Sequence, residues 1–131
     1  MTFWTLEESA SLPLQLGPNA CSAGETRAVG TKLWHLTADR LPSGAIRLSL
    51  KSKVLEVWPS SGAEICICSL KRAKGPGWVA LCMRRAGAQL ETLLEGKESN
   101  DAALEWLLSH REVLGEVFES PVTVEDWGYD C

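Results

Sequence analysis

Five cysteines and two histidines have the greatest capacity for chemistry in this 131-residue sequence. Cys66 and Cys68 alternate with isoleucines in one apolar run, so strand geometry would turn both thiols to one face. Cys82 lies in a second apolar run. Three thiols and a histidine could bind zinc, but the C-x-C pair lacks the usual two to four intervening residues. We therefore predict buried, reduced thiols, no metal site and no cofactor.

Neither histidine lies in a motif that would support catalysis. His35 stands between Trp34 and Leu36 in an extended segment, and His110 lies at the margin of a helical apolar stripe. The sequence contains no G-x-S-x-G, H-E-x-x-H or P-loop motif. The glycines of 75–77 precede a strand, whereas a phosphate site needs a following helix. We therefore predict that the protein is not an enzyme.

The distribution of charge is more informative than the formal net charge of −4. Residues 1–26 carry three acidic and no basic residues, residues 27–85 eleven basic and three acidic, and residues 86–131 two basic and eleven acidic. Either carboxylates of a C-terminal helix neutralise a basic sheet, or the two surfaces attract partners of opposite charge. The candidates for a basic binding face are Arg47, Lys51, Lys53, Lys71, Arg72, Lys74, Arg84 and Arg85.

The acidic end of the chain is a second candidate surface. It combines carboxylates with aromatic anchors, and its candidate binding residues are Glu125, Asp126, Trp127 and Tyr129. Residues 122–124 could add an edge strand, and residues 125–131 are expected to form a mobile tail. We therefore assign residues 1–118 to one α+β domain and residues 119–131 to an acidic C-terminal tail.

Alternation of apolar and polar residues predicts an α+β fold, mainly an antiparallel sheet or a partly open β-barrel of about seven strands. The expected strands are 12–16, 31–37, 45–51, 53–58, 64–70, 78–84 and 88–95, with a loop over 19–30. The segment 88–95 is ambiguous: its leucines fit a helical spacing, but its shortness and flanking glycines slightly favour a strand. One amphipathic helix follows, capped near Asn100 and ended by Pro121.

Seven strands followed by one helix resemble the pleckstrin-homology-like superfold. The stretch 88–108 is similar to that family's last strand and C-terminal helix, where a tryptophan such as Trp106 commonly sits. The resemblance implies two bent sheets with the helix plugging one end. Residues 1–26 hold no basic residue, so the basic lipid-binding motif of a first hairpin is missing. The resemblance therefore implies a member that binds proteins instead of phosphoinositides.

We thus expect a non-catalytic protein-interaction or adaptor domain, a subunit of a larger complex. Its routes to a partner are a wide helix face, an edge strand that accepts another strand, or the acidic tail. The alternatives are a small acidic bacterial immunity protein or secretion-associated chaperone, and binding of anionic lipid or nucleic acid through the basic face. Reduced thiols and the lack of a signal or transmembrane pattern favour a cytoplasmic location.

Overall fold

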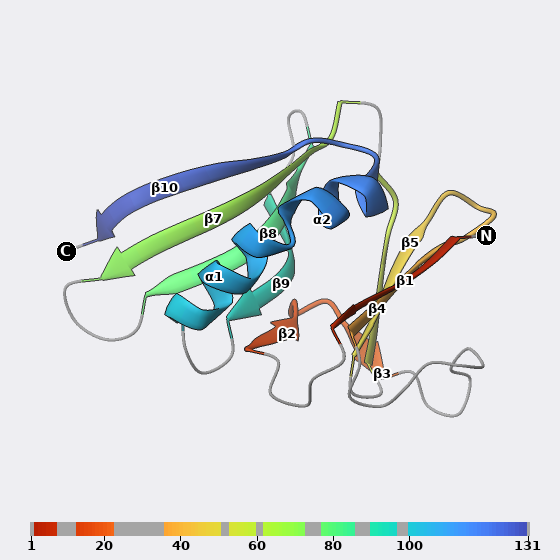
Figure 1. Ribbon diagram of the computed structural model, residues 1–131, viewed down its shortest axis with the longest axis horizontal. Helices are drawn as coiled ribbons and strands as arrows, with labels where there is room; N and C mark the ends of the chain where they lie inside the picture. The colour runs from red at the N-terminus through yellow and green to blue at the C-terminus, as the bar shows by residue number, and fades with distance from the viewer. Residues whose placement is uncertain are drawn as a thin grey trace.

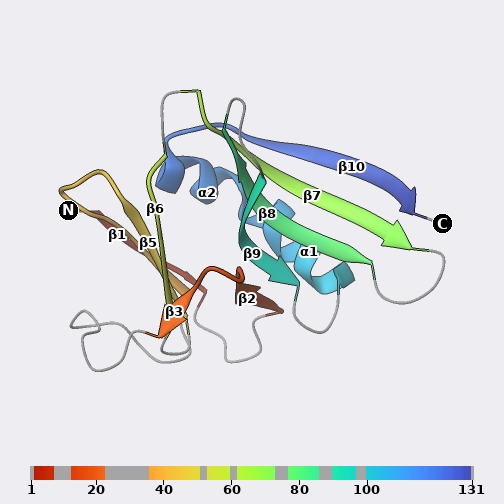
Figure 2. The same ribbon diagram turned by 180° about the vertical axis from the view of Figure 1, so that it is seen from behind.

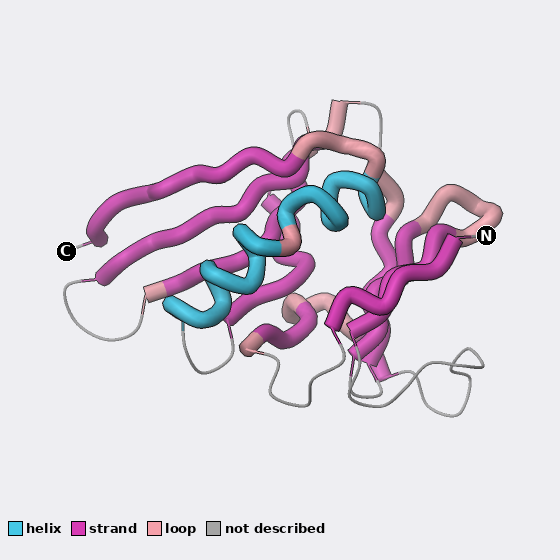
Figure 3. The backbone as a smooth tube through the Cα atoms, viewed as in Figure 1, coloured by secondary structure: helices cyan, strands magenta, loops and turns pink. Residues whose placement is uncertain are grey.

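The computed structural model of the chain describes residues 2–7, 13–22, 36–50, 53–59, 62–72, 77–85, 90–96 and 100–130. Within these ranges, ten strands form two five-stranded sheets, and two helices lie near the C-terminal end of the sequence (Figures 1 and 3). The α+β class is therefore confirmed. About seven strands in one antiparallel sheet or a partly open barrel were expected. The described strands number ten and form two sheets.

Sheet 1 contains the strand order β1-β4-β5-β6-β3, and every neighbouring pair is antiparallel. Its strands are β1 (Thr2–Glu7), β3 (Cys21–Ser22), β4 (Leu36–Arg40), β5 (Ile46–Leu50) and β6 (Lys53–Val57). Ala38, Leu48 and Leu55 are register partners on the inner face of this sheet and enter the main hydrophobic core. The alternation in 45–51 thus predicted the strand and its buried face.

Sheet 2 contains the strand order β10-β7-β8-β9-β2. Its strands are β2 (Leu14–Leu16), β7 (Glu64–Arg72), β8 (Trp78–Arg84), β9 (Leu90–Gly96) and β10 (Val122–Asp130). β10 runs parallel to β7, and the other neighbours are antiparallel. The segment 88–95 is therefore a strand, which confirms the favoured of its two interpretations.

The two helices, α1 (Asn100–Ser109) and α2 (Arg111–Phe118), lie across one face of sheet 2. Figure 1 shows this inner face, and Figure 2 shows the outer face from behind. Leu107 and Leu114, one from each helix, are completely buried in the core with Ile67 and Leu81 of the sheet. This burial is the main reason for the helices to form, because helices this short are marginal alone.

The prediction of a single helix is wrong, because the helical stripe is interrupted at His110. The carbonyl oxygen of Trp106 is shared: the His110 amide donates to it at 3.1 Å, Ser109 Oγ donates at 2.9 Å, and Nδ1 of His110 lies 2.8 Å away. The His110 backbone takes φ −103° and ψ 12°, outside helical geometry. Local side-chain bonds of this kind compete with regular helix hydrogen bonds.

Arg40, at the end of β4, joins sheet 1 to the C-terminus of α2. Its guanidinium donates to the carbonyl oxygens of Glu116 at 2.8 Å and Val117 at 3.1 Å. It also forms an ion pair with Glu119 at 3.0 Å and lies 5.2 Å from the ring centre of Trp4. A cation at a helix C-terminus satisfies unpaired carbonyls and opposes the negative end of the helix dipole. Arg40 therefore fixes how the helix meets sheet 1.

Several predicted boundaries are corrected by the structure. β1 was not predicted, although its aromatic and β-branched residues favour a strand. β3 lies inside the segment 19–30 that was expected to be a loop. The expected strand 31–37 lies mostly outside the described residues, and β4 begins at Leu36 and continues through charged Asp39 and Arg40.

The C-terminal segment, for which a mobile tail was expected, is described as a strand as far as residue 130. β10 includes the expected edge strand at 122–124 and continues to Asp130, paired with β7 along most of its length. The apolar start of β10, Val122, is buried in the core, which anchors the strand next to β7. β10 follows the helices, so the last described element is a strand.

Candidate functional site

Arg84, one of the predicted basic residues, ends β8 and bonds to Glu125 of β10. Its two terminal nitrogens lie 2.9 Å from the two carboxylate oxygens of Glu125, and Nη1 also lies 3.8 Å from Glu64. The hydrogen bonds that Arg84 donates to Glu125 raise the pKa of Arg84 above its usual range. This bidentate geometry is the strongest form of arginine–carboxylate pairing. It joins a predicted basic residue directly to a predicted acidic one.

Arg47 and Arg85 are also paired with carboxylates. Arg47 of β5 donates to Glu56 of β6, directly opposite in the register, at 3.0 Å. Arg85 donates to Glu91 of β9 at 3.0 Å and to the carbonyl oxygen of Trp58. The structure therefore favours neutralisation of these bases within the fold. Their partners come from strands, however, and not from the helix as expected.

The remaining basic candidates are spread over several elements of the chain. Lys53 is exposed at the start of β6, whereas the backbone of Lys71 and Arg72 ends β7. Lys51 and Lys74 lie outside the described residues. Arg47 and Lys53 belong to sheet 1, and Arg84 ends a strand of sheet 2. The predicted basic face is therefore divided between two sheets.

The three strand cysteines come together on the outer face of sheet 2. Cys66, Cys68 and Cys82 are completely buried with Ala80, and the sulfur atoms of Cys66 and Cys68 are 3.3 Å apart. This arrangement confirms the predicted burial. Within the described ranges, no group of three or more His, Cys, Asp or Glu side chains is arranged to hold a metal ion.

Two thiols of this cluster, Cys66 and Cys68, are held in their neutral form. The hydrogen bond with Cys68, followed by burial, raises the pKa of Cys66 far above its usual value. For Cys68, the bond with Cys66 lowers the pKa, but the bond to Cys82 and burial outweigh it and raise the pKa to about 12. Because the thiolate is the reactive species, these cysteines are chemically inert packing groups.

The two histidines supply no catalytic arrangement in the described part of the chain. His35 lies outside the described residues. His110 stacks on Trp106 with ring centres 3.9 Å apart and an interplanar angle of 11°. Its Nδ1 also faces Ser109 Oγ at 3.1 Å and the Trp106 carbonyl. His110 therefore shapes the junction of α1 and α2.

The acidic candidates divide between two surfaces. Glu112, Glu116 and Glu119 line an open groove between α2 and the start of β10, which Arg111 and Val122 also border. Glu125 and Asp126 are not among the described residues that line this groove, and Glu125 bonds to Arg84 instead. Glu112, Glu116 and Glu119 thus border the groove, whereas Glu125 is paired within the sheet.

β10 forms one edge of sheet 2, with β7 as its neighbour in that sheet. Thr123, Val124 and Asp126 are exposed on this strand, and Val124 retains 45% of its surface. Trp127 and Tyr129 lie in the same strand, for which the structure describes the backbone. The strand spans nine residues, longer than the usual five or six. Among the described strands only β7 pairs with β10, and a sheet edge of this kind can present backbone donors and acceptors to other chains.

The structure adds two exposed apolar side chains, Trp58 and Leu108, and the contact of Arg40 with the end of α2. Trp58 is 55% exposed after β6, and Leu108 is 44% exposed on α1 beside half-buried Leu104. Leu108 belonged to the predicted apolar stripe, so its exposure indicates a stripe wider than the core needs. Nothing in the sequence marks Arg40 as the joint to α2, because its partners lie 76 and 77 residues away.

Comparisons with known proteins give no match: no family model fits the sequence, and neither curated proteins nor solved structures include a significant relative. Within the described ranges, the chain forms no helix of the length and apolarity required to cross a bilayer.

Proposed function

We propose that this protein is a non-catalytic interaction domain that binds a basic, extended segment of another protein along the free edge of β10. The observation that carries this proposal is the strand itself: nine residues at the end of sheet 2, paired with β7 on one side. Strand addition to such an edge uses backbone hydrogen bonds for affinity and alternate side chains for specificity.

The charge of β10 indicates the kind of partner. Its sequence contains Glu125, Asp126 and Asp130 and no basic residue. A second copy of β10 would place like charges opposite one another, which is unfavourable in strand pairs. A basic segment would instead meet opposite charges. This complementarity favours a different, lysine- or arginine-rich protein over self-association.

The acidic groove beside the start of β10 supports the same choice. Glu112 and Glu116 lie on α2, Glu119 follows its last residue, and Pro121 and Val122 also line the groove. A basic chain approaching β10 would therefore pass through a negative field before it pairs. Such fields accelerate association and weaken with salt. By contrast, Arg47, Arg84 and Arg85 are already engaged with carboxylates, which argues against anionic lipid or nucleic acid as the ligand.

The proposal is tested by titrating the isotope-labelled protein with a short capped peptide that alternates lysine with threonine or valine. Backbone amide shifts should change along β10 and its neighbour β7. The matched control is the same peptide with alternate backbone amides N-methylated on the pairing edge. It keeps the charge but loses the hydrogen bonds, so we expect it to bind much more weakly. Equal binding of both peptides would contradict strand addition.

A pair of charge variants locates the site. Asp126→Asn on β10 should weaken binding of the alternating peptide by about two- to fivefold, as expected for one exposed charge. Glu112→Gln removes the same charge from the exposed surface of α2 and should have a smaller effect. A larger loss for Glu112→Gln would place the peptide in the helix groove and contradict the assignment to β10.

A further inference from the structure

Helix α1 carries an exposed apolar strip on the side that faces away from sheet 2. Its inner side buries Ala103, Trp106 and Leu107 in the core. On its outer side, Leu104 is half-buried and Leu108 retains 44% of its surface. Residues four apart are neighbours on a helix surface, so these two leucines form one strip. Figure 1 shows α1 in front of sheet 2, with no described strand or helix on its outer side.

An open hollow of about 510 Å³ follows this strip, and its border is acidic. It is lined by Asp101, Leu104, Glu105, Leu108 and Ser109. Asp101 and Glu105 are exposed, and neither forms an ion pair with a described residue. The sequence of α1 contains no lysine or arginine that would balance them. The outer face of α1 therefore combines an apolar strip with unneutralised negative charge.

We infer that the outer face of α1 binds a basic amphipathic helix of another protein. Apolar side chains of the partner, spaced three and four residues apart, would pack on Leu104 and Leu108. Its lysines or arginines would lie beside Asp101 and Glu105. A second copy of α1 would instead bring these carboxylates against their own kind, so complementarity of charge favours a different protein.

This surface is separate from the one proposed for strand addition. α1 packs against β7, β8 and β9, whereas the outer edge of β10 lies beyond β7 in sheet 2. The two surfaces also differ in what they recognise, because a helix is bound by its side chains and an added strand by its backbone. Binding at α1 is therefore independent of binding at β10.

Titration of the isotope-labelled protein with a designed helical peptide tests the inference. The capped peptide has about 15 residues of leucine, lysine, alanine and glutamine, with its leucines on one helix face. The control peptide has the same composition with its leucines distributed around the helix. The first should shift the Leu104 and Leu108 methyl signals and bind about tenfold or more tightly than the control. Equal affinities, or shifts that spare α1, would overturn the inference.

A pair of exposed apolar positions separates this surface from β10. Leu108→Gln removes the apolar contact, keeps a good helix former and should weaken binding of the helical peptide about fivefold or more. The matched control is Val124→Thr on β10, which should leave this binding unchanged. Leu108→Gln should in turn leave binding of the alternating peptide to β10 unchanged. Unchanged affinity of the helical peptide for Leu108→Gln would contradict the assignment to α1.

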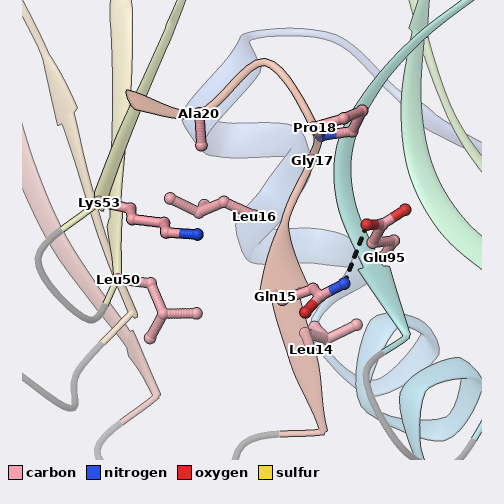
Figure 4. Close-up of a pocket in the computed structure, with 9 residues that line it drawn as sticks. All are labelled: Leu14, Gln15, Leu16, Gly17, Pro18, Ala20, Leu50, Lys53 and Glu95. Carbon is pink, nitrogen blue, oxygen red and sulfur yellow. Dashed lines mark hydrogen bonds between the residues drawn. The ribbon is translucent and has the colours of Figure 1, made fainter. Parts of the chain in front are cut away.

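The contribution of charge is tested by comparing Glu105 with Glu95, which borders a pocket of about 270 Å³ where β2 meets Lys53 of β6. Figure 4 shows β2 between Lys53 and the Glu95 carboxylate, which accepts a hydrogen bond from Gln15 Nε2 at 3.0 Å. Glu95→Gln keeps an accepting oxygen and should not affect the helical peptide. Glu105→Gln should weaken it about two- to fivefold. Equal losses would mean that the peptide follows overall acidity, which would overturn the inference.

A second copy of the chain is the competing occupant of this face. Sedimentation of the wild type and of Leu108→Gln over a range of protein concentrations distinguishes the two. We expect both proteins to show the same state of association. A dimer that Leu108→Gln abolishes would assign the outer face of α1 to self-association and would contradict the binding of a basic partner.

Discussion

The two five-stranded sheets bury very different chemistry on their outer faces. Sheet 1 buries the polar residues Thr37, Asp39 and Ser49, which lie on neighbouring strands. Sheet 2 buries three thiols and an alanine. Thr37 Oγ1 has no hydrogen-bond partner among the described residues, and an unsatisfied buried hydroxyl is costly. A thiol, by contrast, behaves as a small hydrophobe and can be buried at little cost.

The stability of sheet 1 therefore depends on the protonation of a buried carboxyl, Asp39. On the outer face of sheet 2, the buried Cys66 and Cys68 stay neutral below about pH 9. Burial raises the pKa of Asp39, and the nearby Arg47 lowers it by a smaller amount. On sheet 2, Arg84 at the end of β8 forms a compact ion pair with Glu125 within β10. Sheet 2 therefore buries thiols on its outer face and leaves this charged pair partly exposed.

The largest effect is expected at the joint between the sheets. Gly17→Ala would drive a Cβ atom into the backbone of β9, so it should lower the free energy of unfolding by about 3 kcal/mol or more. Urea denaturation measures the loss. The matched control is Gly44→Ala, whose Cβ would meet open space and whose cost is mainly the positive φ, about 1 kcal/mol. Equal losses would mean that the close approach of β2 to β9 is not tight.

Removing the thiol cluster should sharpen the contrast at alkaline pH. A thiol whose pKa is raised in the folded state contributes stability that is present below about pH 9 and lost as pH rises toward the folded value. For Cys68, with a folded pKa of about 12, the loss at pH 10 is about 1 kcal/mol. The variant Cys66→Ala/Cys68→Ala should therefore lose less stability than the wild type between pH 7 and 10 in urea titrations.

Cys21→Ala serves as the control for this alkaline series, because Cys21 is exposed. It should follow the wild-type pH dependence. If the double alanine variant followed the wild-type curve as well, the thiols would not be the groups responsible.

A smaller change in the pH dependence of stability is expected at Asp39 on sheet 1. Because the pKa of Asp39 is raised, its neutral form suits the fold, and stability is lost as pH rises through the folded pKa. Asp39→Asn should therefore gain relative to the wild type between pH 3 and 7, within about 1 kcal/mol. Thermal unfolding at the two pH values measures the difference. A variant that is less stable at pH 7 than at pH 3, relative to wild type, would show that the pairing with Arg47 dominates.

The smallest effect is expected at Glu119, which links the helix to Arg40. Glu119 adopts a left-handed conformation with φ 52°, which favours glycine, while its exposed ion pair with Arg40 adds little. Glu119→Gly should relieve the backbone strain and change stability by less than about 1 kcal/mol. Both variants lose the ion pair, and Glu119→Ala also keeps the strain, so it should be the less stable of the two. A Glu119→Gly variant clearly less stable than the wild type would mean that the ion pair outweighs the strain.

Local patterns predicted the elements that depend on local properties. The alternation in 45–51 and the cysteine–isoleucine run in 64–70 marked β5 and β7 and their buried faces. The apolar stripe marked the helical region, but the break at His110 depends on two side chains sharing one carbonyl. Such competition is decided by geometry that periodicity does not contain.

The pairing of elements distant in the sequence could not be predicted. Glu125 meets Arg84 across 41 residues, and Gln15 meets Glu95 across 80. Composition showed that acidic and basic blocks exist, but strand order decides which charges meet. For the same reason, the β10 edge was only one of three routes to a partner, and the pocket at Lys53 had no signal beyond the turn at Gly17.

The central claim is that the edge of β10 accepts a basic strand, and interstrand nuclear Overhauser contacts test it most directly. With the alternating lysine peptide bound, the account predicts a ladder of backbone contacts between the peptide and residues 123–126. Contacts confined to α2 residues such as Glu112 and Glu116, with none to β10, would contradict it.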